Sequence, residues 1–190
     1  FGTFTDTLRS AGYDVVFDVL YGPDYGLAQT RSRLVLLASR LGRISLPEPT
    51  HPNDHRTVEM EIGKLPALIA GDSDRNDRLH RASRLSPTNL ERIRASKPGG
   101  TWRDWPEQLV AKCHKEDAGR GYSAVYGRMS PDRPAPTITT PFYGFGNGRF
   151  GHPHQDRGLS LREGAMLQGF PPDYQFVPEG EPISFKNVGK

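Results

Sequence analysis

The sequence predicts an α/β fold in which the edge of a larger sheet is followed by a small, loop-rich unit of mixed helices and strands. Two apolar runs, 14–21 and 33–39, lack the alternation of half-buried strands, as is typical of a sheet covered on both faces. The 21 glycines and 17 prolines among 190 residues favour long loops around a small core. No apolar stretch approaches the length of about 18 residues that a membrane span needs, so we expect no membrane partner.

The N-terminal part carries a helix end and two strands. Phe4 and Leu8 stand at helical spacing, and Gly12 follows where the helix would end. The two apolar runs are bounded by turn residues and predict buried strands. From Pro47 the chain becomes polar and rich in proline, which indicates a domain boundary.

Two short helices are expected near the middle of the chain. Ser86 and Pro87 have the residue types of a helix cap and of the first helical position. Segment 102–109 predicts a second short helix.

A strand and a final helix are expected in the last third. The β-branched run 137–140 predicts a strand between loops. Segment 160–170 predicts a helix, because Ser160 and Glu163 have capping-box spacing.

The middle of the chain is basic. Residues 75–133 carry 13 basic and 7 acidic side chains, whereas the flanking parts are acidic or neutral. Of the 25 basic residues 19 are arginine, whose planar guanidinium suits bidentate contacts to phosphate and guanine. These observations favour a polyanion as partner, although a solvated face with scattered ion pairs would have the same composition.

Gln29, Arg31 and Arg33 are spaced two apart where the chain enters an apolar strand. In an extended chain all three side chains would project to one side. Two guanidinium groups at a strand edge are suited to contact phosphate or the edge of a base. The alternative is a solvent-exposed strand end with an ion pair to Asp24.

This segment resembles the eighth conserved motif, Gln-x-Arg-x-Arg, of the cytosine-5 DNA methyltransferases. Segment 126–140 is similar to the recognition-loop segment of that family, and segment 151–171 is similar to its ninth motif. The three motifs follow one another in the family's order. The resemblance covers nearly the whole chain, and the poorly matching stretch at about 42–95 lies in the most variable part of the family's target-recognition domain. The family's cofactor loop (Phe-x-Gly-x-Gly), its Pro-Cys nucleophile and its Glu-Asn-Val motif all lie upstream of the region covered by these motifs.

The resemblance implies that residues 1–46 are the C-terminal strands of the catalytic domain, at the edge of a Rossmann-like methyltransferase sheet. Residues 47–158 would form the target-recognition domain, a small, loop-rich mixed α/β unit. Residues 159–190 would form a helix and a segment that returns toward the catalytic domain.

The resemblance also implies roles for single residues near the chemistry. Arg33 would face a cytosine swung out of the duplex and hold its carbonyl edge. Arg31 and Gln29 would support Arg33 or touch phosphate.

Six further residues are expected to contact DNA. Arg128 and Tyr143 would lie on two loops that face the major groove, and Thr137 and Thr139 would hydrogen-bond backbone phosphate. The six residues are Arg128, Arg133, Thr137, Thr139, Tyr143 and Arg149.

A complete enzyme of this kind would methylate carbon 5 of cytosine within a specific DNA sequence, in the cytoplasm of a bacterium or as a phage-encoded protein. S-adenosyl-L-methionine would be the cofactor of that complete enzyme, while this chain alone would bind none and would be inactive. Its partners would be double-stranded DNA and the missing N-terminal catalytic half, within a monomeric enzyme. The alternatives are a non-catalytic DNA-binding subunit or degenerate methyltransferase-like module, and a binder of RNA or single strands.

Three further patterns are weak candidates for chemistry. The Gly-x-Gly-x-x-Gly run at 146–151 precedes no predicted helix, which a dinucleotide site requires. Cys113, the single cysteine, does not follow a proline and is expected to be an ordinary cysteine. Cys113, His114, His152 and His154 lack the spacing of zinc ligands, so we expect no metal site.

Overall fold

The computed structural model describes residues 1–116 and 121–189. Residues 117–120, within the expected recognition domain, and residue 190, the end of the expected return segment, lie outside this description. The helices and strands of the described residues are α1 (Gly2–Ser10), β1 (Asp14–Tyr21), β2 (Gln29–Thr30), β3 (Ser32–Ser39), α2 (Val58–Ile62), α3 (Pro87–Ala95), α4 (Lys112–Lys115), β4 (Ala135–Pro136), α6 (Leu161–Met166) and α7 (Phe185–Val188). The 3-10 turns are η1 (Gly22–Tyr25), η2 (Trp102–Asp104), η3 (Glu107–Leu109) and η4 (Phe145–Asn147).

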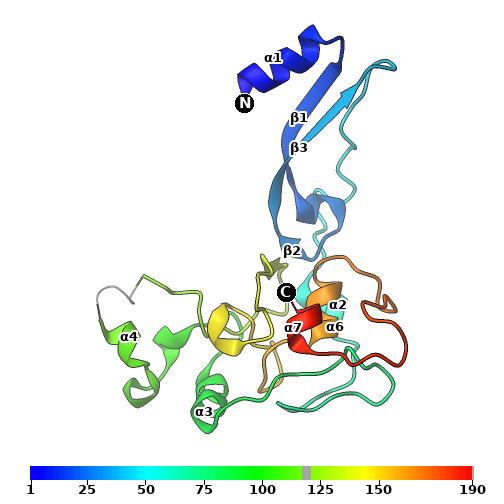
Figure 1. Ribbon diagram of the computed structural model, residues 1–190. Coiled ribbons are helices and arrows are strands. Elements are labelled where there is room, and N and C mark those ends of the chain that lie inside the picture. The colour runs from blue at the N-terminus through cyan, green and yellow to red at the C-terminus, as the bar shows by residue number, and fades with distance from the viewer. Residues whose placement is uncertain (117–120, 190) are drawn as a thin grey trace.

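The architecture is mixed α/β, with two small sheets of two strands each. Figure 1 shows α1 and the β1–β3 hairpin projecting from a loop-rich body, in which α2, α6 and α7 lie together. The expected α/β class and the large share of loops are therefore confirmed.

The N-terminal elements confirm the predicted helix end and both predicted strands. α1 ends at Ser10, and Gly12 has a φ of +86°, a conformation that glycine adopts without a Cβ clash. β1 and β3 pair antiparallel over their whole length, with Asp14 opposite Ser39 at one end. The hairpin therefore forms from the two apolar runs of the sequence.

The expectation that these two strands are buried is wrong for the described structure. No residue of β1 or β3 is buried, and Phe17, Val19 and Leu34 are 39%, 60% and 51% exposed. The reason is that the hairpin stands away from the body (Figure 1), with α1 as its main neighbour. The ring of Phe1 meets that of Phe17 edge to face at 4.8 Å, which covers only a small part of the strand surface.

The second sheet joins β2 and β4 in parallel, with Gln29 opposite Ala135 and Thr30 opposite Pro136. The strand predicted at 137–140 is therefore wrong: β4 lies earlier and is shorter. The reason is that the N–H of Ile138 donates to the side chain of Gln29 at 3.1 Å instead of to the backbone of a neighbouring strand.

The predicted helix start at residue 86 is confirmed, whereas the helix expected at 102–109 is not. The hydroxyl of Ser86 accepts a hydrogen bond from the N–H of Asn89, and α3 begins at Pro87. Segment 102–109 forms the separate turns η2 and η3. Pro106 lies between them, and its missing N–H prevents one continuous helix.

The last predicted helix forms but ends early. Ser160 and Glu163 make the reciprocal capping box, with the Ser160 N–H 2.7 Å from the Glu163 carboxylate. α6 ends at Met166, and the chain turns at Gly169, whose φ is +87°.

Two clusters of buried apolar side chains hold the body together. The larger cluster joins α2, α6 and the β2–β4 sheet, and its buried members include Ala28, Val58, Met129, Ala135 and Leu161. The smaller cluster contains Ile93, Trp102, Trp105 and Phe145. Within the described residues, no helix has both the length and the apolar character to cross a membrane.

Candidate nucleic-acid interface

The two segments expected to contact DNA meet at the β2–β4 sheet. The N–H of Ala135 donates to the carbonyl of Ala28 at 2.9 Å, and the hydroxyl of Thr30 donates to the carbonyl of Ala135 at 3.1 Å. The hydroxyl of Thr137 in turn donates to the carbonyl of Thr30 at 2.6 Å. The segment before β3 and the segment after β4 are therefore held side by side, and we call this contact the β2–β4 seam.

A pocket of about 310 Å³ lies against this seam. Thr30, Arg133 and Arg149 line it together with Ser130 and Gly99. One nitrogen of Arg149, Nη1, donates to the carbonyls of Gly99 and Gly100, which fixes the guanidinium and leaves its other N–H groups available. The exposed guanidinium of Arg133 makes no hydrogen bond or ion pair with another described residue. The pocket is therefore cationic and suited to an anion.

The structure separates Gln29 from the two arginines, so the expectation that all three side chains lie on one side of a single strand is wrong. β2 ends at Thr30 and β3 begins at Ser32, so the three residues do not share one strand. The pairing changes at Arg31, whose carbonyl accepts from the N–H of Gly22 at 2.7 Å. Arg33 is exposed on β3, whereas Gln29 is 1% exposed.

The side chain of Gln29 is directed into the protein, whereas a residue expected to touch phosphate would present it at the surface. Its Nε2 donates to the carbonyl of Leu167 at 3.0 Å, and its Oε1 accepts from the N–H of Ile138 at 3.1 Å. The whole side-chain amide is thus used inside the protein.

The alternative pairing of Arg33 with Asp24 does not form. Asp24 contacts His55 instead, with 2.8 Å between the carboxylate and Nε2. Arg33 donates through Nη1 to the carbonyl of Ser32 at 2.7 Å. Its remaining N–H groups face solvent, which leaves them free for a ligand.

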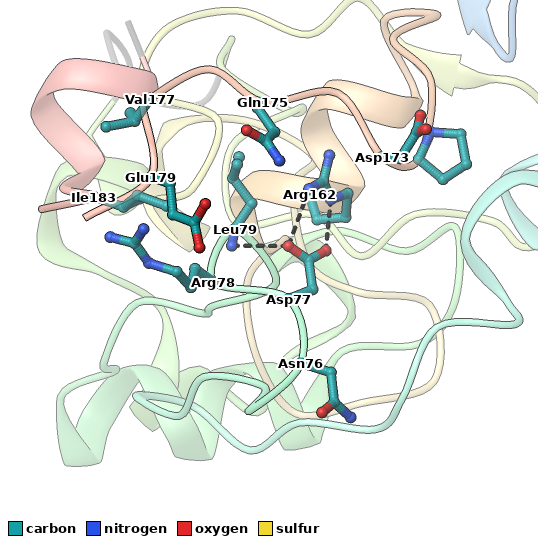
Figure 2. A pocket seen from close by; sticks show the side chains of 11 residues that line it. Asn76, Asp77, Arg78, Leu79, Arg162, Asp173, Gln175, Val177, Glu179 and Ile183 are labelled. Atoms are coloured by element: carbon teal, nitrogen blue, oxygen red, sulfur yellow. Dashed lines mark hydrogen bonds and ion pairs between the residues drawn. The ribbon is translucent and has the colours of Figure 1, made fainter. Parts of the chain in front are cut away.

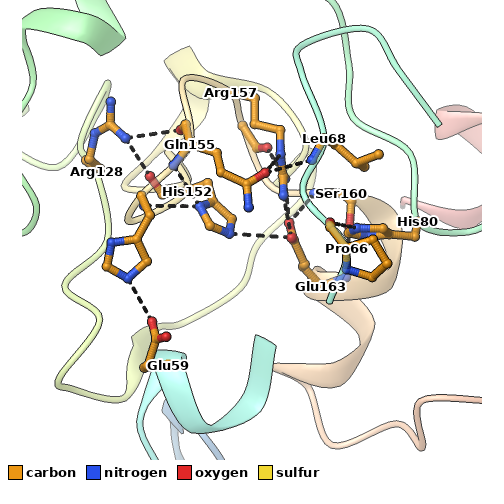
Figure 3. A network of polar contacts seen from close by, with 12 residues as sticks. Glu59, Pro66, Leu68, His80, Arg128, His152, Gln155, Arg157, Ser160 and Glu163 are labelled. Carbon is orange, nitrogen blue, oxygen red and sulfur yellow. Dashed lines mark hydrogen bonds and ion pairs between the residues drawn. The ribbon is translucent and has the colours of Figure 1, made fainter. Parts of the chain in front are cut away.

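Arg128 is buried and bonded to other parts of the protein, which differs from the surface position expected of a residue that faces the major groove. It is 5% exposed. Its two terminal nitrogens donate to the carbonyls of His152 (3.0 Å), Gln155 (3.1 Å) and Ile93 (2.6 Å) and to the carboxylate of Asp156 (2.7 Å). Figure 3 shows this guanidinium turned toward the 152–155 loop. Arginine suits such a place because its fork of N–H groups can satisfy several carbonyls at once.

Tyr143 and Thr137 also differ from expectation. The ring of Tyr143 is partly buried against Phe142 and Phe185, at centroid distances of 5.9 and 5.0 Å, rather than fully exposed on a loop. The hydroxyl proton of Thr137 is donated to Thr30 and is not available to a phosphate. Thr139 is exposed and makes no side-chain hydrogen bond with another described residue.

A buried polar network behind the interface has only one sequence signal, the capping box. Arg157 and Glu163 are 0% and 1% exposed and form an ion pair at 2.6 Å. His152 lies 3.6 Å from the same carboxylate, and its Nδ1 accepts from the N–H groups of His154 and Gln155. Figure 3 shows how these side chains join the 152–157 loop to the start of α6.

The pKa values of two groups in this network are lower than their ordinary values. Burial lowers the pKa of His152 to about 4, although the charge of Glu163 opposes the shift. Burial alone would raise the pKa of Glu163, but the hydrogen bond and positive charge of Arg157 outweigh it and lower that pKa. At neutral pH the network therefore contains a neutral imidazole beside one compensated ion pair.

A third buried arginine, Arg162, bonds α6 to the segment around Asp77. Arg162 is 4% exposed and grips the carboxylate of Asp77 through two hydrogen bonds of 2.6 and 3.0 Å, which Figure 2 shows at the edge of a pocket of about 430 Å³. Its third contact goes to the carbonyl of Tyr174 at 2.9 Å. Desolvation would raise the pKa of Asp77, but the hydrogen bond and charge of Arg162 lower it. These contacts indicate a structural role for Arg162.

The cysteine and histidine residues that are weak candidates for chemistry have ordinary structural surroundings. Cys113 is exposed, and the ring of His114 stacks on Trp102 at 4.5 Å. His154 pairs with Glu59 at 2.8 Å. Across residues 1–116 and 121–189, no three His, Cys, Asp or Glu side chains are grouped as metal ligands.

Comparisons with known proteins show the family of this chain. The sequence profile of the family described as C-5 cytosine-specific DNA methylase matches residues 1–190. The type II methylase M.HgiDII of Herpetosiphon aurantiacus is 52% identical over 191 residues, which cover 100% of this chain and 54% of that protein. The type II methyltransferase M1.HphI of Haemophilus parahaemolyticus is 33% identical over 174 residues, covering 91% of this chain and 43% of that protein. The chain thus spans about half the length of the curated relatives it matches.

The fold has a counterpart among solved structures. A DNA modification methyltransferase encoded within an E. coli prophage superposes with a TM-score of 0.62 at 19% identity, covering 99% of this chain and 59% of that chain. At this identity the likeness concerns the fold alone, whereas the sequence profile covers every residue. The chain belongs to the C-5 cytosine-specific DNA methylase family.

Proposed function

We propose that this chain is the DNA-recognising part of a sequence-specific DNA (cytosine-5-)-methyltransferase. The observation that carries the proposal is the β2–β4 seam, which brings segments 29–33 and 133–139 together beside a pocket with two arginines. In the proposed division, residues 1–46 belong to the catalytic domain, residues 47–158 form the target-recognition domain, and residues 159–190 return toward the catalytic domain.

The donors around the seam are of the kind that grips a DNA backbone. Arg31 and Arg133 make no side-chain hydrogen bonds with other described residues, and Arg149 keeps part of its guanidinium available. Thr139, which lies between Arg133 and Arg149 in the sequence, is exposed and adds a hydroxyl. Positive charges of this kind bind phosphates whatever the base sequence, and they fix the register in which other groups read the bases.

Arg33 is the proposed contact to the reacting base. Attack on carbon 5 of cytosine requires the base to leave the helical stack, because its ring faces are covered inside a duplex. A guanidinium on β3 can donate two parallel N–H groups to the carbonyl edge of such a base. Arg33 fits this role because a single hydrogen bond to the carbonyl of Ser32 holds it and most of its donors stay free.

The family uses S-adenosyl-L-methionine, and the glycine-rich loop of this chain does not fit that cofactor. Residues 142–146 have the Phe-x-Gly-x-Gly spacing, yet Phe142 and Phe145 are 6% and 1% exposed and belong to the two apolar clusters. A Cβ on Gly146 would lie 3.0 Å from the ring of Tyr126, and one on Gly148 would lie 2.5 Å from the ring of Phe150. Of the two glycines within the motif spacing, Gly146 makes room for the ring of Tyr126 and Gly144 for the side chain of Asn147, and the nearby Gly148 makes room for Phe150. Cofactor binding and the thiol nucleophile are therefore assigned to the other half of the complete enzyme.

The exposed hairpin is the proposed junction with that half. Phe17, Val19 and Leu34 expose apolar surface on paired strands, and burying such surface stabilises an assembly by about 25 cal/mol per Å². A catalytic half that extends and covers this sheet would supply the burial that the sequence of both strands predicts.

The test first compares binding to duplex and single-stranded DNA and then measures methylation. The complete protein containing this chain should bind a mixed-sequence 30-base-pair duplex more tightly than either single strand, and selection from a randomised duplex pool should enrich one sequence. With S-adenosyl-L-methionine it should then methylate cytosine within that sequence, while residues 1–190 alone should not. A preference for single strands would overturn the proposal, and duplex selection without methyl transfer would favour the non-catalytic DNA-binding alternative.

A further inference from the structure

Gln29 connects three parts of the molecule that are far apart in sequence. It lies in β2, two residues before Arg31, and its side chain is almost fully buried at 1% exposure. Its donor and its acceptor point to different segments, namely the end of α6 at Leu167 and the chain after β4 at Ile138. Both hydrogen bonds close gaps of more than 100 residues, so neither follows from local structure.

Each contact meets a specific backbone need. Leu167 follows α6 directly, and the last carbonyls of a helix have no partner within the helix. Ile138 is 5% exposed, and its N–H would be buried without an acceptor if Gln29 were apolar. Glutamine is suited to both tasks because one end of its amide donates and the other accepts.

We infer that Gln29 is a positioning residue, which sets the distance between the arginines of segment 31–33 and the phosphate contact at Thr139. The inference rests on the function proposed above. The amide of Gln29 pins Ile138, and Thr139 is the next residue, with its hydroxyl at the surface. On the other side, Gln29 and Thr30 form β2, which leads directly to Arg31. One buried amide therefore fixes both halves of the DNA site in a single relative placement.

The test replaces Gln29 by methionine in the complete enzyme, because methionine keeps the length of the side chain and removes both hydrogen bonds. The matched control is Ile93→Val, a buried change in α3 that belongs to the smaller apolar cluster rather than to the cluster at the seam. Single-turnover methylation at saturating duplex, duplex affinity and melting temperature are measured on each preparation. We expect Gln29→Met to slow methylation at saturating DNA at least tenfold, while the control stays within about twofold even where the two melting temperatures fall equally.

A double-mutant cycle with Thr139→Ala distinguishes positioning from general stability. If Gln29 acts through the placement of Thr139, the loss of duplex affinity caused by Gln29→Met should shrink at least threefold when Thr139 is already alanine. Additive losses, or a methylation rate for Gln29→Met equal to that of the control, would overturn the inference. In those cases the wild-type enzyme would still bind duplex and transfer methyl groups, so the proposed function would stand. A wild-type enzyme without either property would reject the proposed function itself.

Discussion

Arg157 and Glu163 form a two-point ion pair inside the protein, with 2.7 Å from Nη1 to Oε2 and 2.6 Å from Nη2 to Oε1. The same carboxylate accepts from the N–H of Ser160 at the start of α6. The pair therefore ties the 152–157 loop to the helix that carries the Leu167 carbonyl. That carbonyl accepts a hydrogen bond from the side chain of Gln29, which connects the ion pair to the β2–β4 seam.

Replacing Glu163 by glutamine should destabilise the protein strongly. The change leaves the guanidinium of Arg157 buried without a counter-charge, and breaking a buried pair in this way costs about 3–5 kcal/mol. Urea unfolding followed by tryptophan fluorescence measures the loss. The control is Asp6→Asn in the exposed pair of Asp6 and Arg9, which should change the free energy of unfolding little. Equal effects of the two substitutions would contradict the assigned role of the buried pair.

Stability should fall as the pH is lowered from about 6.5 to about 4, in part because of His152. Its pKa is lowered by burial to about 4 in the folded state, so in this window the unfolded chain binds a proton that the folded protein does not. Stability therefore rises with pH across the window, and the contribution of His152 reaches at most about 3 kcal/mol.

The variant His152→Asn isolates this contribution. An asparagine carbonyl can still accept from the N–H groups of His154 and Gln155, but it does not titrate. Urea midpoints at pH 7 and pH 5 should differ less for the variant than for the wild type. The same pH dependence in both proteins would show that other groups cause the acid sensitivity.

Local signals in the sequence predicted local structure well. Ser86 before Pro87, and Ser160 three residues before Glu163, place their caps as predicted, because each cap joins residues three apart. Both long strands of the hairpin also form where the apolar runs stand. Their burial was not predicted correctly, since it depends on which surface covers them rather than on their own side chains.

The arginines of the candidate site show what sequence reasoning missed. Arg128 and Arg133 are five residues apart and look alike in the sequence, yet one is buried and the other is exposed. The partners of Arg128 lie at Ile93 and in the 152–156 loop, a distance along the chain that no spacing rule reaches. The basic residues of segment 75–133 therefore include buried arginines with internal hydrogen bonds and exposed arginines with surface charge. The fold is needed to tell one kind from the other.

This separation predicts opposite results for Arg128→Ala and Arg133→Ala. Arg128→Ala should lower the free energy of unfolding by about 3 kcal/mol or more, because four hydrogen bonds of a buried guanidinium are lost, and the remaining folded enzyme should keep its sequence preference. Arg133→Ala should leave stability unchanged and weaken binding to all duplexes alike, lowering the salt dependence of affinity by about one counterion. Melting curves and duplex titrations at several salt concentrations measure both. A changed sequence preference for Arg128→Ala would return that residue to the interface.

Arg33→Lys should lower the rate of methylation in the complete enzyme more than it lowers duplex affinity. Arg33 is exposed on β3, a paired strand, and among the described residues its guanidinium bonds only to the carbonyl of Ser32. Lysine keeps the positive charge, so attraction to phosphate is largely preserved. It loses the planar pair of N–H groups that can hold a base carbonyl in one orientation.

The matched control for this change is Arg9→Lys, an exposed arginine on α1, which should alter neither quantity. Single-turnover methylation and duplex affinity should be measured on the same preparation as the melting temperature, because β3 pairs with β1 and a folding defect would lower all three together. A selective loss of rate of at least tenfold, at unchanged melting temperature, is the expected result, since a misplaced base reacts slowly even when the duplex is bound. A rate equal to that of Arg9→Lys would remove Arg33 from the reacting base and leave Arg31 as the remaining candidate on this segment.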